Sequence, residues 1–70
     1  MTDTKRLEEY IQASGYKKSY IAKTIGVSVE TLSRKLRNAT QFKASEIKIL
    51  CALLNIQDPA EKEAIFFAGK

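Results

Sequence analysis

Length, composition and charge limit the classes of protein to which this chain can belong. Its 70 residues predict one domain with one core, and 44% hydrophobic with 29% charged residues is typical of a globular protein. With no histidine and a single cysteine, Cys51, the composition excludes an internal disulfide, a metal-ligand set and histidine-dependent catalysis. We therefore expect no enzyme activity, no catalytic residues, no metal and no cofactor. The chain also lacks a signal-peptide core and an apolar run long enough for a membrane span, so a cytoplasmic location is expected.

The net charge of +4 is unevenly distributed along the chain. Between residues 15 and 43 there is one acidic residue, Glu30, and the basic residues are Lys17, Lys18, Lys23, Arg34, Lys35, Arg37 and Lys43. The flanking segments together are slightly acidic. A basic centre of this kind is typical of a nucleic-acid-binding face, although it is also compatible with an ordinary solvated surface.

The first predicted element is a helix from about Asp3 to Ser14. Leu7, Tyr10 and Ile11 fall on one face of such a helix. Gly15 is expected to end it.

The stretch from Lys18 to Asn38 predicts two short helices joined by a tight turn. Each has one apolar stripe, formed by Ile21, Ala22 and Ile25 in the first helix and by Val29, Leu32 and Leu36 in the second. Gly26 suits the left-handed residue at a helix end, and Ser28 can cap the second helix, which is expected over about 29–37. Lys35 is unusual because it lies on the apolar side of that helix, next to Leu36. The pattern is typical of a helix-turn-helix.

The C-terminal part predicts two more helices. Phe42 is expected to fold back onto the core, and residues 44–55 form an apolar, central helix in which Cys51 is a small core residue. Asp58 and Pro59 begin a last short helix. This helix ends in Ile65, Phe66 and Phe67, which are the candidate residues for contact with a partner. Because adjacent phenylalanines point in different directions, one should close the core and the other should contact a partner, which we expect to be a second copy of the chain.

At the turn the pattern resembles a known family. Ala22, Gly26, Val27 and Leu32 stand where the phage Cro/CI-like helix-turn-helix regulators, the XRE-like class, keep a small residue, the turn glycine and two core residues. The runs GYKKSYIAKTIGVSVETLSRKL and FKASEIKILCALLNI are similar to the same class, and QF at residues 41–42 and IFF at residues 65–67 are similar to small phage regulators of Gram-positive bacteria. The resemblance implies a lambda-repressor-like fold: an all-α bundle of about five short helices, as a single domain over residues 1–70.

The resemblance also implies a role for particular residues. The family often has Ser or Thr followed by Gln where this chain has two lysines, and Tyr16 stands at a position that the family usually gives to a core leucine. Residues on or near the outer face of the recognition helix are expected to contact DNA bases: Val29, Glu30, Thr31, Ser33 and Arg34. Its flanks are expected to contact phosphates through Lys17, Lys18, Lys35, Arg37, Asn38 and Lys43. Val29 has two possible roles, as a core residue or as a contact to a thymine methyl group, and the apolar stripe favours the core.

The leading hypothesis is a sequence-specific regulator of transcription that binds double-stranded operator DNA as a homodimer, in the manner of a Cro-like phage or prophage repressor. The alternative is an antirepressor, a small lysogeny-switch protein that binds a phage repressor through its apolar C-terminus. An enzyme is the least favoured reading, because nucleophile–base pairs and a glycine-rich phosphate loop are missing from the sequence.

Overall fold

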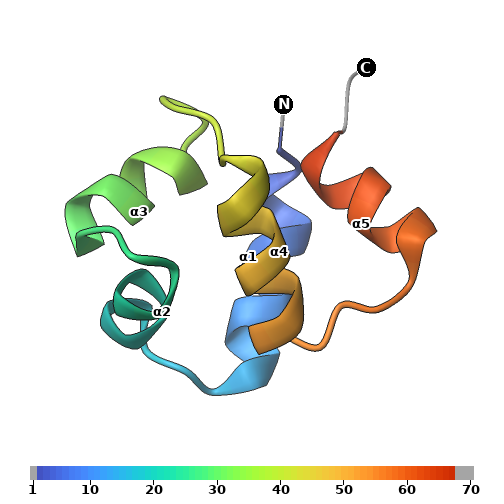
Figure 1. Ribbon diagram of the computed structural model, residues 1–70, viewed down its shortest axis with the longest axis horizontal. Coiled ribbons are helices and arrows are strands. Elements are labelled where there is room, and N and C mark those ends of the chain that lie inside the picture. Colours follow the sequence, from blue (N-terminus) through green and yellow to red (C-terminus); the bar gives the residue numbers. More distant parts are fainter. Residues whose placement is uncertain (1, 68–70) are drawn as a thin grey trace.

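The computed structural model describes residues 2–67, which form an all-α bundle of five helices (Figure 1). The helices are α1 (Thr4–Ser14), α2 (Lys18–Ile25), α3 (Val29–Leu36), α4 (Ala44–Leu53) and α5 (Pro59–Phe66). Residues 1 and 68–70 of the predicted domain lie outside the described part. None of these five helices has the length and apolar character needed to cross a membrane.

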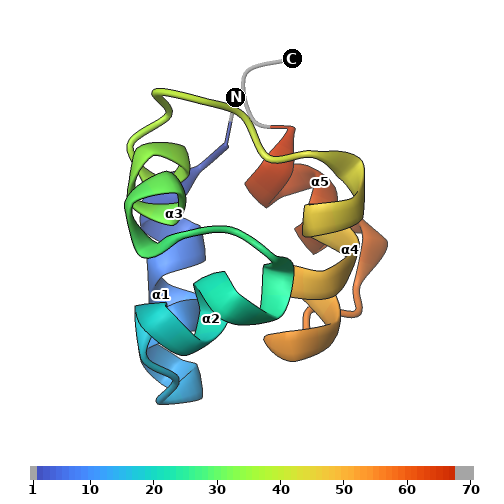
Figure 2. The same ribbon diagram turned by 60° about the vertical axis from the view of Figure 1, so that its left-hand side comes forward.

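The helices are arranged with α2 and α3 on one side, α5 on the other, and α1 and α4 between them (Figure 1). Helix α2 packs against both α3 and α4, and α1 packs against α5. The turned view shows α3 stacked above α2 (Figure 2). The two ends of the described chain meet, because the N–H of Asp3 donates a hydrogen bond of 2.6 Å to the Ile65 carbonyl. The pair α2–α3 is therefore carried on a scaffold formed by the other helices.

One apolar core joins all five helices. It comprises Leu7, Ile11, Ile21, Ala22, Ile25, Leu32, Leu36, Phe42, Leu50, Cys51, Leu54, Ile56, Ile65 and Phe66. Phe42 and Cys51 are buried as predicted, and burial raises the pKa of the Cys51 thiol, which makes it less reactive. Helix α4 is less enclosed than predicted, because Ile49 is exposed while Leu50 on the inner side is fully buried.

Local side chains explain where the helices begin. Asp3 accepts a hydrogen bond from the Arg6 N–H (3.1 Å), Ser28 from the Thr31 N–H (3.1 Å) and Asp58 from the Ala60 N–H (3.0 Å). These are N-terminal caps, each of which contributes about 1 kcal/mol. At α2, Lys17 occupies the cap position, and its side chain makes no capping bond there.

Left-handed residues explain where the helices end. Gly15 and Gly26 have φ values of 76° and 88°, as their predicted positions require. Asn38 (φ 61°) and Asn55 (φ 59°) take the same conformation, so α3 ends at Leu36 and α4 at Leu53, both earlier than the sequence predicts. Asparagine tolerates this conformation better than other residues with a Cβ atom, and that tolerance places the two ends.

Candidate nucleic-acid interface

The turn between α2 and α3 holds the two helices in a fixed relation. The N–H groups of Gly26 and Val27 both donate to the Ala22 carbonyl, each at 2.9 Å. Val27 is partly buried against the core below the turn. Ser28, besides capping α3, donates its hydroxyl to Thr31 Oγ1 at 2.9 Å. The turn is therefore ordered by residues that the sequence pattern identifies.

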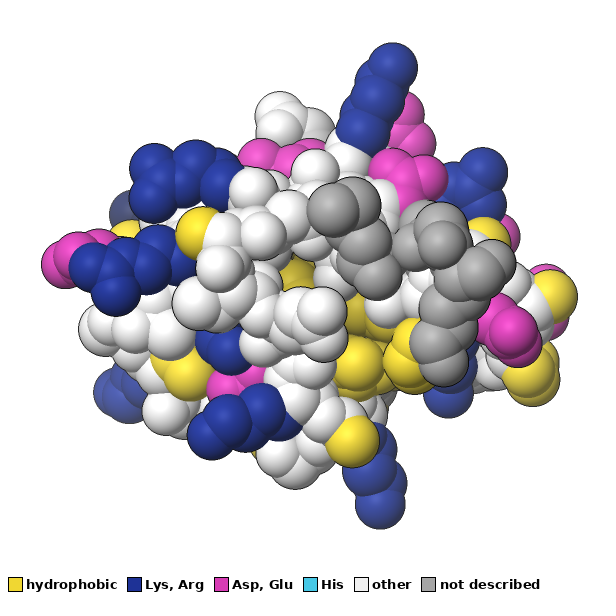
Figure 3. Space-filling view, turned by 90° about the horizontal axis from the view of Figure 1, so that it is seen from above, with side chains coloured by type: hydrophobic (Ala, Val, Ile, Leu, Met, Phe, Trp, Pro, Cys, Tyr) yellow, Lys and Arg dark blue, Asp and Glu magenta, His cyan; other side chains and the backbone are white. Residues whose placement is uncertain are grey.

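Helix α3 separates an apolar side from a polar one. Its inner side buries Leu32 and Leu36, while Glu30 and Arg34 on the outer side are exposed. Ser33 and Thr31 are half-buried at the margins. Seen from above, Lys and Arg side chains lie on the side of the molecule that α3 occupies, with acidic side chains among them and further basic side chains elsewhere on the outline (Figure 3). A helix that presents a polar face and basic flanks can enter the major groove of duplex DNA.

Val29 lies on this outer surface, contrary to the favoured prediction. Its side chain is 49% exposed, so the first residue of α3 does not belong to the core. Val29 is the first residue of α3. The space beneath the helix is filled by Leu32 and Leu36, which are buried. The other predicted role of Val29, contact with a thymine methyl group, stays a prediction.

An ion pair links the two charged residues of the outer face. The guanidinium nitrogen Nη2 of Arg34 lies 2.8 Å from Glu30 Oε1, one helical turn away. Both side chains are more than half exposed, so solvent screening reduces this pair to a few tenths of a kcal/mol. The Arg34 guanidinium can therefore leave Glu30 for another partner at a small cost in free energy.

The predicted phosphate contacts fall into groups with different surroundings. Lys17, Lys18, Arg37 and Lys43 are exposed, Lys17 and Lys18 at the start of α2 and the other two after the end of α3. Lys18 forms an ion pair of 3.1 Å with Glu8 of α1, and both side chains are more than 40% exposed. An exposed pair of this kind is weak, so it leaves Lys18 available to a phosphate.

Lys35 corrects the prediction, because its side chain is inside the protein. It is only 5% exposed, and its ammonium lies 3.0 Å from Glu46 Oε1 and 3.0 Å from the Gln41 carbonyl. The same ammonium lies 5.7 Å from the centre of the Phe42 ring. A charge held in this way cannot reach a DNA phosphate, so Lys35 is removed from the phosphate set.

Glu46 is the acidic partner of Lys35, and no sequence pattern singles it out. Burial alone would raise the pKa of its carboxyl group. The hydrogen bond from the Lys43 N–H (2.9 Å) and the Lys35 ammonium outweigh burial, so the pKa of Glu46 lies below its ordinary value. Glu46 therefore stays ionised at neutral pH.

Asn38 also has a structural role. Its amide oxygen accepts a hydrogen bond from the Thr2 N–H (3.2 Å), and its amide nitrogen donates to the Thr2 carbonyl (3.0 Å). The side chain thus attaches the start of the chain to the turn after α3. We leave Asn38 out of the phosphate set for this reason.

Tyr16 also differs from its prediction, since it is 42% exposed and does not occupy the core. Its ring lies 5.1 Å from the ring of Tyr20, in the first turn of α2. The two rings line a shallow depression together with Gly15, Lys17, Ser19 and Lys23. The aromatic pair was missed because Tyr20 lies on the polar side of its helix. The depression extends the basic surface towards the turn between α1 and α2.

The predicted partner contact at the C-terminus is reduced to one residue. Ile65 and Phe66 are buried, and the Phe66 ring packs edge-on against Phe42 at 5.9 Å, so neither offers a surface to a partner. The prediction that one phenylalanine closes the core is confirmed by Phe66, whereas Ile65 and Phe66 are removed from the candidate partner contacts because α5 turns both side chains towards the core. Phe67 is exposed and remains the predicted contact.

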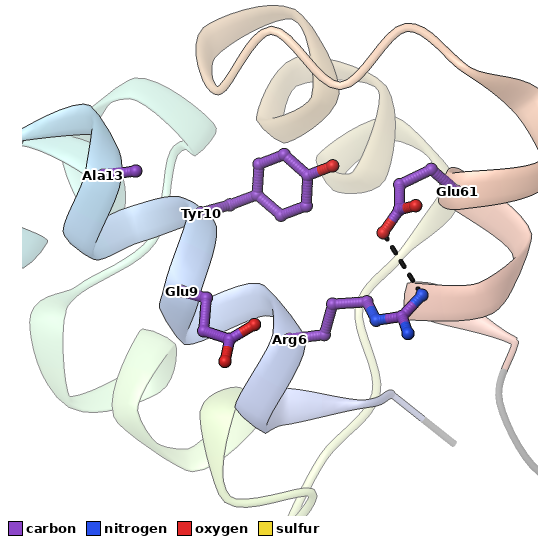
Figure 4. Close-up of a pocket in the computed structure, with 5 residues that line it drawn as sticks. All are labelled: Arg6, Glu9, Tyr10, Ala13 and Glu61. Carbon is purple, nitrogen blue, oxygen red and sulfur yellow. Dashed lines mark hydrogen bonds and ion pairs between the residues drawn. The ribbon is translucent and has the colours of Figure 1, made fainter.

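A pocket between α1 and α5 has a different character (Figure 4). It is lined by Arg6, Glu9, Tyr10, Ala13 and Glu61. Arg6 spans the pocket to pair with Glu61 at 3.3 Å. Its basic residue is thus neutralised from within the protein, so this pocket gives an anionic ligand no advantage.

Comparisons of the chain with protein-family models, curated proteins and solved structures found no match.

Proposed function

We propose that this protein binds double-stranded DNA sequence-specifically and regulates transcription as a small repressor. The observation that carries the proposal is the polar outer face of α3, on which Glu30 and Arg34 are exposed beside Val29. Helix α2 is joined tightly to α3 by the hydrogen-bonded turn and supports it from behind. In this proposal α3 lies in the major groove, with Thr31 and Ser33 at the edges of the contact.

Exposed basic residues of two segments would hold the DNA backbone. Lys17 and Lys18 lie at the start of α2, whereas Arg37 and Lys43 lie beyond the end of α3. Contacts from such cations to phosphates would fix the register of the recognition helix on the duplex. Repression then follows from occupation of the site, in the cytoplasm and without an effector.

A homodimer is part of the proposal. One domain with one recognition helix reads a short site, and two copies related by a twofold axis would read a palindrome. Phe67 is the contact that we retain for this association, because it is the exposed member of the phenylalanine pair.

Substitution of Arg34 should separate base reading from backbone binding. A guanidinium that forms two hydrogen bonds to a guanine discriminates between base pairs by about 1–3 kcal/mol. Arg34→Ala should therefore weaken binding to a duplex enriched from a random-sequence pool by roughly tenfold or more, and leave binding to a scrambled duplex nearly unchanged. The measurement is a pair of titrations at one salt concentration.

Lys18→Ala is the matched control. Its ammonium is expected to meet only the DNA backbone, so both duplexes should lose affinity nearly equally. Equal losses on both duplexes for Arg34→Ala would remove Arg34 from the base-reading set. If neither duplex is bound by the unsubstituted protein, the alternative of a module that binds a repressor protein is favoured instead.

A further inference from the structure

The buried ion pair between Lys35 and Glu46 connects two helices through one oxygen atom. Glu46 Oε1 lies 3.0 Å from the ammonium at the end of α3. The same oxygen accepts the N–H of Lys43, at the start of α4, at 2.9 Å. The end of α3 and the beginning of α4 are therefore fixed to a common point.

The segment between the two helices is held by the same group. The Lys35 ammonium also donates to the Gln41 carbonyl and lies over the ring of Phe42, which in turn packs against Phe66. Among residues 2–67, every buried side-chain nitrogen and oxygen has a hydrogen-bond partner, so this polar cluster is fully satisfied. It lies beneath the loop that carries Arg37 and Lys43.

An apolar contact could not set this geometry as sharply. Helix α3 packs mainly against α2, and its buried stripe consists of Leu32 and Leu36. Apolar burial has no preferred direction, so such a stripe tolerates small rotations of the helix. Hydrogen bonds donated by an ammonium have defined directions, and in some proteins a buried polar or ionic group sets a unique packing arrangement without adding stability over apolar residues.

We propose that Lys35 and Glu46 are positioning residues, which set the rotation of α3 relative to α4 and thereby determine how well the protein discriminates between DNA sequences. The inference rests on the proposed function, because it concerns the same recognition helix. Neither residue contacts DNA in this proposal. It deepens that proposed function by assigning sequence discrimination to two buried residues that lie behind the interface.

The test is the double variant Lys35→Met/Glu46→Leu, which replaces the pair by apolar side chains of similar size. Urea unfolding should show a midpoint equal to or above that of the unsubstituted protein. The ratio of affinities for enriched and scrambled duplexes should nevertheless fall about tenfold, the discrimination of one base pair. The control variant Lys48→Met/Glu63→Leu removes one exposed charge of each sign and should keep the ratio.

Amide hydrogen exchange gives a readout that does not depend on DNA. The double variant should exchange faster in the last turn of α3 and in residues 37–43, with α1 unchanged. An unchanged affinity ratio, unchanged exchange, or a large loss of the urea midpoint would each overturn the positioning role. If the unsubstituted protein does not discriminate between duplexes, the proposed function fails. The amide exchange of the double variant is then still informative: faster exchange at the end of α3 supports the positioning role, and unchanged exchange overturns it.

Discussion

Replacing Glu46 alone should destabilise the protein far more than replacing an exposed carboxylate. Glu46→Leu leaves the Lys35 ammonium buried with the Gln41 carbonyl and without its counter-ion. Removal of one partner from a buried pair costs about 3–5 kcal/mol. A domain has a total stability of about 5–15 kcal/mol, and a small one lies near the lower end, so the variant should be largely unfolded when warmed. Urea unfolding at neutral pH measures the loss, with the exposed Glu63→Leu as control.

The destabilisation by Glu46→Leu should also depend on pH. The folded pKa of Glu46 is depressed below the ordinary value of 4.5, so its contribution to stability is complete above that pH. This contribution disappears as the pH falls through the folded pKa, because a protonated Glu46 carries no charge, as a leucine at the same position carries none. The difference in the free energy of unfolding between the unsubstituted protein and Glu46→Leu should therefore become smaller in acid. A small loss at neutral pH, or a gap that stays constant with pH, would show that the pair is energetically unimportant.

Binding to duplex DNA should weaken steeply as salt is added. Removal of Lys35 and Asn38 from the predicted contacts leaves Lys17, Lys18, Arg37 and Lys43 as the exposed phosphate set of each protomer. The four phosphates neutralised by each bound protomer contribute about −3.6 to the slope of log affinity against log salt, from roughly −0.9 for each phosphate. Between roughly 50 and 200 mM salt, the affinity should fall about 150-fold for one bound protomer, and more steeply for a dimer. Titrations at several salt concentrations measure this slope directly.

Two lysine substitutions test whether the salt dependence comes from the predicted phosphate contacts. Lys18→Ala should lower the slope by about 0.9, the release of one counter-ion. Lys48→Ala removes an exposed lysine of α4 that belongs to no predicted contact, and the slope should not change. A slope shallower than about −2 for the unsubstituted protein would mean that these four residues are not the footprint.

Local chemistry made much of the fold predictable from the sequence. The glycine turn at Gly26, the caps at Ser28 and Asp58 and the start of α5 at Pro59 depend on residues within a few positions of each other. The apolar stripes of α2 and α3 follow from helical period alone, apart from Val29 at the first position of α3. For that reason the helices were predicted with errors mainly at their C-terminal ends, where an asparagine ends the helix in a conformation that few other residues adopt.

Contacts between distant residues were not predictable in this way. The sequence places Lys35 on the apolar side of its predicted helix. Its partner, Glu46, lies 11 residues further on, beyond a loop whose path no local pattern specifies. Asn38 meets Thr2, which is 36 positions away in the sequence. The family resemblance predicts that Tyr16 is a core residue. Its exposure depends instead on the directions of α1 and α2 on either side of the turn that joins them. The corrections therefore concern tertiary packing rather than helix formation.

The central claim, that the outer face of α3 reads base sequence, is tested most directly by enrichment of bound duplexes from a random-sequence pool at low salt. The unsubstituted protein should enrich one short motif, repeated symmetrically if the dimer binds. Arg34→Ala should enrich a motif that has lost its preference at one base pair in each half. Enrichment of no motif by the unsubstituted protein, or of the same motif by Arg34→Ala, would contradict the account.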